Sequence, residues 1–133
     1  MISNNKVKKI LLVDDEPDVI YTIKNILEDN RRFKVDTFND PIIALKSYKN
    51  DFYDLIILDI KMPKMDGFEL YTKIREKDHK VKICFLTAIT TFNEDFRKLR
   101  MKFGNTIDED YFIQKSIRTE NLVKKLTSII NIK

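Results

Sequence analysis

The chain has 133 residues, of which 43% are hydrophobic and 35% are charged, and this composition is typical of one folded domain with a buried core. The formal net charge is +4, but the 25 Lys and Arg residues are interspersed with 21 acids, which indicates a solvated surface rather than a nucleic-acid site. Two glycines are too few for a Gly-rich phosphate loop, and no apolar run approaches the ~20 residues that cross a bilayer.

Residues 1–6 are mostly polar and lack the apolar segment of a signal peptide. A single cysteine, Cys84, excludes an intrachain disulfide and fits a reducing compartment. We therefore expect a cytoplasmic protein that does not contact membranes. We expect one domain over residues 1–133, with a polar tail at residues 1–6 and the core at residues 7–132.

The chain begins its regular structure with a short apolar run at residues 10–13, which predicts a buried strand. Asp14 and Asp15 follow it, and Pro17 suits the first turn of a helix whose positive pole favours these acids. Apolar residues then recur at helical spacing, and Asn30 can end this amphipathic helix.

The next strand and helix follow directly. Residues 33–38 alternate between apolar and polar side chains, as in a strand near the edge of a sheet. Asp40 and Pro41 then form a cap and a helix start, and we expect that helix to run to about Asn50.

The rest of the chain is organised around residues 53–67. Residues 55–58 form an unbroken apolar run of branched side chains, which is typical of a parallel strand covered on both faces. That strand ends in a carboxylate, Asp59, and the turn-forming residues Pro63, Asp66 and Gly67 require a loop before the next helix.

The second half continues the alternation. Residues 68–77 predict a helix and residues 81–86 a strand that ends at Thr87; His79, between them, is expected on the surface and Cys84 in the core.

A longer helix follows at residues 92–103, with one apolar stripe, and Gly104 can end it. Residues 111–115 predict a fifth strand, and residues 122–130 a last amphipathic helix. Five alternations of strand and helix indicate a single α/β domain with a parallel sheet, right-handed crossovers and helices on both faces.

In such a sheet the carboxyl ends of the strands gather Asp14, Asp15, Asp59, Thr87 and Lys115 at one edge, which is where α/β proteins bind ligands. Three adjacent carboxylates repel one another unless a cation neutralises them or a pKa rises. Oxygen ligands and an open, shallow site suit Mg²⁺, which keeps several of its waters. The sequence therefore predicts a magnesium site.

These motifs resemble those of the receiver domain of two-component response regulators. They are Asp14-Asp15-Glu16-Pro17, the segment 59–67, Thr87-Ala88 and Lys115, and the resemblance covers almost the whole chain in the right order. The most specific part is the segment 59–67. The resemblance implies a doubly wound, flavodoxin-like (βα)5 fold with strand order 2-1-3-4-5.

It also implies a role for each residue at the strand ends. Asp59 is then the phosphoacceptor, which takes a phosphoryl group from a phosphohistidine of a sensor histidine kinase or phosphotransfer protein. Asp14, Asp15, Asp59 and the backbone carbonyl of Lys61 are the expected Mg²⁺ ligands, and Lys115 is expected to pair with a phosphoryl oxygen. The expected protein is a phosphoacceptor with at most slow self-dephosphorylation rather than an enzyme.

The resemblance further implies a switch between two states. The Thr87 hydroxyl is expected to bind the phosphoryl group, and this movement is expected to be coupled to an aromatic residue three positions before the lysine, Phe112. The surface formed by residues 92–103, residues 111–115 and the last helix is then expected to bind an unknown downstream protein, with the chain as a monomer or weak dimer.

The chain departs from the family in two places. Receivers usually have a proline joined to the lysine by a cis bond, and here the residue is Ser116, so we expect a trans bond. The segment between Thr87 and Lys115 is several residues longer than usual. The Lys61 side chain, two residues past the acceptor, is expected to face solvent.

Four hypotheses about the function remain open. A stand-alone receiver is expected, because no residues are left for an output domain. A haloacid dehalogenase-like phosphatase or phosphotransferase carries a second aspartate two residues after its nucleophile, where this chain has Lys61. A phosphorylation-independent interaction module is favoured only by Ser116. Direct DNA binding is disfavoured because there is no helix-turn-helix beyond the domain.

Overall fold

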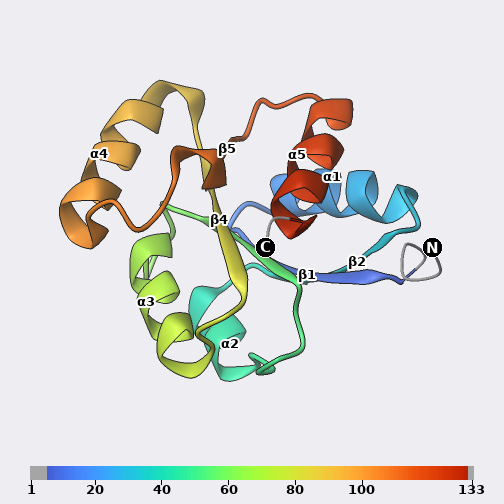
Figure 1. The fold of residues 1–133 in the computed structure, drawn as a ribbon, viewed down its shortest axis with the longest axis horizontal. Coiled ribbons are helices and arrows are strands. Elements are labelled where there is room, and N and C mark those ends of the chain that lie inside the picture. Colours follow the sequence, from blue (N-terminus) through green and yellow to red (C-terminus); the bar gives the residue numbers. More distant parts are fainter. Residues whose placement is uncertain (1–5, 132–133) are drawn as a thin grey trace.

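Five parallel strands form one sheet in a computed structural model, which describes residues 6–131 apart from the side chain of Ile89 (Figure 1). The strand order is β2-β1-β3-β4-β5, as the resemblance implied. The strands are β1 (Lys8–Val13), β2 (Phe33–Phe38), β3 (Leu55–Asp59), β4 (Lys82–Thr87) and β5 (Phe112–Gln114). Most of the predicted tail, residues 1–5, and the predicted end of the core at residue 132 lie outside the described residues.

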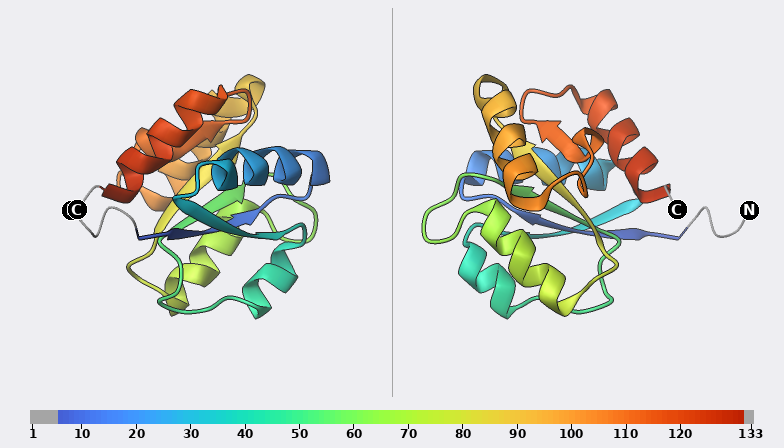
Figure 2. Two further views of the ribbon diagram at one scale, coloured as in Figure 1. Left: turned by 90° about the vertical axis from the view of Figure 1, so that its right-hand side faces the viewer. Right: turned by 60° about the vertical axis from the view of Figure 1, so that its left-hand side comes forward.

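Helices alternate with the strands along the chain, and short 3-10 helices at Ile89–Thr91 and Glu109–Tyr111 complete the connections on either side of α4. The helices are α1 (Pro17–Asp29), α2 (Pro41–Lys46), α3 (Gly67–Lys77), α4 (Phe92–Phe103) and α5 (Thr119–Asn131). Both edge views show helices on the two sides of the twisted sheet (Figure 2). Within the described residues, no helix is both long enough and apolar enough to cross a membrane.

The alternation of side chains along the strands divides the core into two layers. In β1, Leu11 and Val13 pack with residues of α2, α3 and α4, while Ile10 and Leu12 pack with residues of α1 and α5. Every residue of the central strand β3 is buried. An apolar run covered on both faces is thus a consequence of helices on both sides of the sheet.

Local signals set most helix boundaries. The Asp40 carboxylate accepts hydrogen bonds from the backbone N–H groups of Ile42 and Ile43, and Asp66 caps α3 in the same way. Gly104 ends α4 with a φ of +68°, a conformation that glycine adopts without steric cost.

The prediction that the second helix runs to about Asn50 is wrong, because α2 ends at Lys46. The Tyr48 hydroxyl donates to Asp78 Oδ2 at 2.8 Å, and the Asp51 backbone N–H donates to the same oxygen at 3.3 Å. Asp51 also has a left-handed φ of 59°. Contacts with the segment after α3 therefore hold this stretch in a non-helical path.

Candidate functional site

The carboxyl ends of β1 and β3 bring the three predicted acids together. Val13 pairs with Leu58 in the sheet, so the residues that follow them, Asp14 and Asp59, are neighbours. Carboxylate oxygens of Asp14, Asp15 and Asp59 all lie within 4.8 Å of one another. Asp14 is 0% and Asp59 3% exposed, whereas Asp15 is half-buried.

The loop after β3 is held by backbone contacts. The Gly67 N–H donates to the Ile60 carbonyl at 2.7 Å, and the Ile60 N–H donates to the Leu86 carbonyl of β4 at 3.3 Å. The Lys64 ammonium, beyond Pro63, pairs with Asp40 at 2.7 Å. These contacts close the loop over the end of β3 and restrict the position of the Asp59 main chain.

Burial changes the ionisation of the two inner acids. Removal from water, followed by the charge of Asp14, raises the pKa of Asp59 to about 7 against the pull of Lys115. Burial also raises the pKa of Asp14, although the backbone N–H of Glu16 hydrogen-bonds its carboxylate at 2.8 Å. The Oδ2 atoms of both acids are buried and accept no hydrogen bond. Buried oxygens of two neighbouring acids that accept no hydrogen bond fit a site that receives a cation, and the Lys115 ammonium already lies 3.3 Å from one of them, Asp14 Oδ2.

Lys115 supplies the positive charge beside these acids. Its ammonium lies 3.3 Å from Asp14 Oδ2, 3.2 Å from Asp59 Oδ1 and 2.7 Å from Glu16 Oε1. Burial disfavours the charged ammonium, but the hydrogen bond with Glu16 and the charges of Asp14 and Asp59 outweigh it, so the pKa of Lys115 is raised. The backbone N–H of Lys115 donates to the Thr87 carbonyl at 2.9 Å, which ties the end of β5 to β4.

The donor set fits Mg²⁺, which prefers carboxylate oxygens and retains waters at an open site. Asp14, Asp15 and Asp59 would hold it. The fourth predicted ligand, the main-chain carbonyl of Lys61, stays a prediction. The Lys61 side chain is exposed, as expected, and so leaves the carboxylates free of a competing cation at that position.

Thr87 lies at the predicted strand end, but its hydroxyl already has a partner. Thr87 is 2% exposed, and its Oγ1 donates to Asp95 Oδ2 of α4 at 2.6 Å. Within residues 6–131 no hydrogen bond joins this hydroxyl to Asp59 or Lys115. Sequence reasoning missed Asp95. The available signal was its position three residues after Phe92 and four before Leu99, on the apolar stripe of the helix.

Phe112 is buried at 2% exposure against an aromatic cluster that spans β4 and α4. Its ring centroid lies 5.6 Å from that of Phe85, 5.7 Å from that of Phe92 and 5.3 Å from that of Phe96. Phe112 is thus buried in this conformation, and its coupling to Thr87 stays a prediction.

Three smaller predictions, for one peptide bond and two side chains, agree with the structure. The bond between Lys115 and Ser116 is trans, since no cis peptide bond occurs in the described part of the chain. His79 is exposed, and Cys84 is fully buried with a free thiol.

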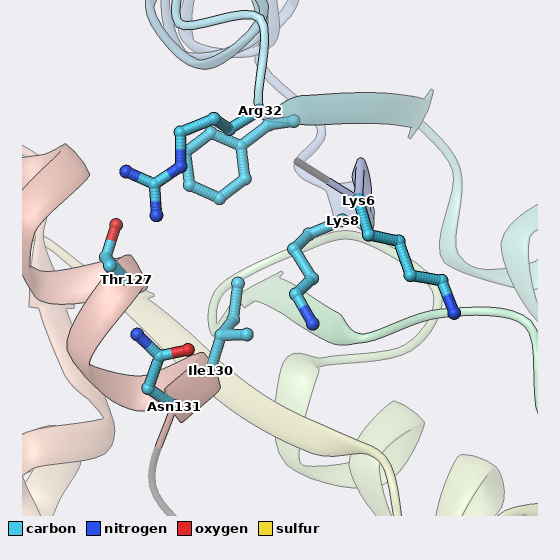
Figure 3. Close-up of a pocket in the computed structure, with 7 residues that line it drawn as sticks. Lys6, Lys8, Arg32, Thr127, Ile130 and Asn131 are labelled. Carbon is cyan, nitrogen blue, oxygen red and sulfur yellow. The ribbon is translucent and has the colours of Figure 1, made fainter. Parts of the chain in front are cut away.

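A cavity of about 500 Å³ lies at the amino-terminal ends of the strands, opposite the acid cluster, between the starts of β1 and β2 and the end of α5 (Figure 3). Its lining includes Lys6, Lys8 and Arg32 from the strand side, and Thr127 and Asn131 from the helix. None of its lining residues is an acid, and none is a predicted site residue. The candidate chemistry therefore belongs to the carboxyl edge.

Fold and site together define a flavodoxin-like α/β domain with a cluster of acids at the carboxyl ends of β1 and β3. The family model for the response regulator receiver domain matches residues 10–127, and the chain belongs to this family. Receiver domains bind Mg²⁺ at an acidic site, and this chain has an acid cluster of that kind.

Individual relatives agree with this assignment. The transcriptional regulatory protein RprY of Bacteroides fragilis is 28% identical over 130 residues, which cover 98% of this chain and 52% of RprY. The alkaline phosphatase synthesis transcriptional regulatory protein PhoP of Bacillus subtilis is 31% identical over 123 residues, which cover 92% of this chain and 48% of PhoP. The chain thus spans about half the length of these two relatives.

Among solved structures, the receiver domain of the sensor histidine kinase PA1611 from Pseudomonas aeruginosa has a TM-score of 0.78 at 26% identity. The match covers 95% of this chain and 99% of that one, whose structure has a magnesium ion coordinated in the active site cleft.

Proposed function

We propose that this chain is a phospho-accepting receiver in which Asp59 takes a phosphoryl group from a phosphohistidine of a sensor histidine kinase or phosphotransfer protein. The observation that carries the proposal is the environment of Asp59, a buried carboxylate with acids on one side, the Lys115 ammonium on the other and an oxygen without a hydrogen-bond donor. Family membership supports the same reaction.

In the proposed transfer, a carboxylate oxygen of Asp59 attacks the phosphorus atom. The bond from phosphorus to the histidine nitrogen breaks as the new bond to oxygen forms, and the histidine keeps the electron pair of the broken bond. Asp14, Asp15 and Asp59 would hold Mg²⁺, which supplies positive charge to the phosphoryl oxygens.

Lys115 neutralises charge on the other side of the same group. Its ammonium, now shared by Asp14, Asp59 and Glu16, can turn toward a phosphoryl oxygen while it remains near Asp59. Its raised pKa keeps it protonated at neutral pH. The Thr87 hydroxyl would donate to another phosphoryl oxygen once it leaves Asp95.

The proposed output is a change at the surface formed by α4, β5 and α5, which a downstream protein binds and which Phe112 couples to the movement of Thr87. The aromatic contacts of Phe112 with Phe92 and Phe96 link this surface to the segment after Thr87. We propose that the chain acts in the cytoplasm as a monomer or weak dimer, without direct contact with nucleic acid or membrane, and with at most slow self-dephosphorylation.

Intact-protein mass spectrometry after incubation with Mg²⁺ and acetyl phosphate tests the proposal. We expect one added phosphoryl group on the wild-type protein and none on Asp59→Ala or in a metal-free sample. A Glu76→Gln variant, at an exposed position on α3, should be phosphorylated as the wild type is.

If folded wild-type protein takes no phosphoryl group from acetyl phosphate or from a cognate kinase, a phosphorylation-independent interaction module is the better reading. Ser116, in place of the usual proline, is the feature of this chain that favours that alternative.

A further inference from the structure

Asp95 is a buried carboxylate that the phosphoryl-transfer chemistry does not use. It is 2% exposed on α4, and its Oδ2 accepts hydrogen bonds from Thr87 Oγ1 at 2.6 Å and from Thr91 Oγ1 at 3.0 Å. Figure 1 shows α4 leading away from the carboxyl end of β4, where Thr87 lies. Asp95 thus joins the last residue of a core strand to the helix that follows it.

The position of Asp95 makes these hydrogen bonds strong determinants of local structure. It shares the inward side of α4 with Phe92 and Leu99, and Leu99 is fully buried. A buried carboxylate is costly to leave without donors, and hydrogen bonds to a charged acceptor are stronger than those between neutral groups. Two hydroxyl groups, those of Thr87 and Thr91, are the donors that satisfy Oδ2.

The Thr87 hydroxyl has one proton and so makes one strong donation at a time. In the structure that proton goes to Asp95, while the proposed phosphorylated state needs it at a phosphoryl oxygen on Asp59. The two acceptors therefore compete for the same donor.

We infer that Asp95 is a positioning residue that holds Thr87 in its resting orientation, so that phosphorylation of Asp59 must take the Thr87 hydroxyl from the α4 carboxylate. The effect on phosphorylation rests on the proposed function, whereas the contact between Thr87 and Asp95 is observed independently of it. When the Thr87 hydroxyl turns away, Thr91 is the remaining hydroxyl donor to Asp95 among the described residues, and the loss of one donor opposes the active state.

Phe112 does not share this role. It is already buried against Phe92 and Phe96 of the same helix. The step that distinguishes resting from active protein is therefore centred on the Thr87–Asp95 contact rather than on burial of the aromatic ring.

The first arm of the test uses nuclear magnetic resonance without any phosphodonor. In wild-type protein the Thr87 hydroxyl proton should exchange slowly with water. Three-bond couplings from the backbone nitrogen and carbonyl carbon of Thr87 to its methyl carbon should report a single χ1 rotamer. In Asp95→Asn the couplings should average over rotamers, whereas Glu94→Gln, which removes a charge from the adjacent exposed position paired with Lys98, should match the wild type. A wild-type Thr87 that already averages over rotamers would overturn the inference.

The second arm measures the apparent affinity for beryllium fluoride, a mimic of the phosphoryl group, in the presence of Mg²⁺. Asp95→Asn should bind it roughly tenfold more tightly than wild type, because a charge-assisted hydrogen bond no longer opposes the change. In a Thr87→Val background the same substitution should have no effect, since the competing donor is absent. An equal gain in both backgrounds, or no gain in either, would refute the role of Asp95.

The two arms separate this inference from the proposed function. Wild-type protein that binds no beryllium fluoride and accepts no phosphoryl group would contradict the proposed function, and the rotamer of Thr87 would still decide whether Asp95 holds it. If Asp95→Asn does not fold, the same measurements are made on Asp95→Ala. The exchange rate of the Thr87 hydroxyl proton in the wild type then still tests whether Asp95 holds it.

Discussion

Gly67, the first residue of α3, packs directly against the main-chain carbonyl of Asp59. A Cβ atom at residue 67 would lie against that carbonyl oxygen and 2.9 Å from the Ile60 Cα, closer than side chains approach backbone in folded proteins. The backbone of Gly67 does not have a positive φ, so lack of space rather than conformation requires glycine here. The absence of a side chain at residue 67 therefore allows the start of α3 to pack against the end of β3.

Gly67→Ala should displace the Asp59 main chain and lower the free energy of unfolding by about 1–3 kcal/mol, as overpacking against backbone does. Urea denaturation measures the stability, and acetyl phosphate labelling should slow in parallel. Gly104→Ala is the control for lack of space, because a Cβ there meets no atom within 4 Å; its φ of +68° would still destabilise an alanine, so this variant should lose stability but keep the wild-type labelling rate. Labelling at the wild-type rate in Gly67→Ala would show that the close contact does not position the acceptor.

Asp59→Asn should stabilise the metal-free protein at alkaline pH. The folded state holds the Asp59 proton up to a pKa of about 7, because burial and then Asp14 disfavour the charged form. The unfolded chain releases that proton near pH 4, so stability falls as pH rises between about 4 and 7. Removing the charge should raise the free energy of unfolding by about 1–3 kcal/mol at pH 8.

This gain should shrink as the pH falls below about 7 and approach zero only below about pH 4, where the unfolded chain also holds the proton. Thermal unfolding in a chelator at several pH values measures it, and Glu76→Gln at an exposed position serves as the control. A stability difference that does not change with pH would show that Asp59 titrates normally.

Asp15→Asn should weaken Mg²⁺ binding at least about tenfold, since a carboxylate ligand is lost from a cluster that attracts the ion by its charge. Isothermal titration calorimetry gives the dissociation constant. Asp18→Asn removes an exposed acid from the first turn of α1 and should change it far less. Equal losses in the two variants would mean that general charge, not coordination, governs binding.

Phe112→Ala should destabilise the fold by about 3–5 kcal/mol, because a buried ring that contacts Phe85, Phe92 and Phe96 would leave a cavity. Urea unfolding followed by circular dichroism measures the change. Met101→Ala, at a position that is 76% exposed on α4, should stay within about 0.5 kcal/mol of wild type. A small effect at Phe112 would indicate that the aromatic cluster repacks around the gap.

Much of the architecture could be predicted because its causes are local in the chain. The apolar run before Asp59 predicts a strand buried on both faces, and Asp40 and Asp66 each cap the helix that follows them. The end of α2 could not be predicted, since it depends on hydrogen bonds from Tyr48 and Asp51 to a carboxylate far along the chain, Asp78.

The candidate site divides in the same way. Its acids stand at strand ends, so Asp14 and Asp59 could be placed together from strand order, and Lys115 with them. The unequal burial of these groups, the second partner of Lys115 at Glu16 and the raised pKa of Asp59 follow from packing in three dimensions.

The sequence by itself determined the alternation of strands and helices and the residues that end each strand, because these follow from periodicity, capping and turn chemistry within short segments. Only the tertiary structure decided which partner each side chain has. Thr87 donates to Asp95 rather than toward Asp59 because the first turn of α4 places this carboxylate beside the end of β4, and no local pattern specifies that contact. Hydrogen-bond partners of buried polar groups depend on distances between segments that only the folded chain defines.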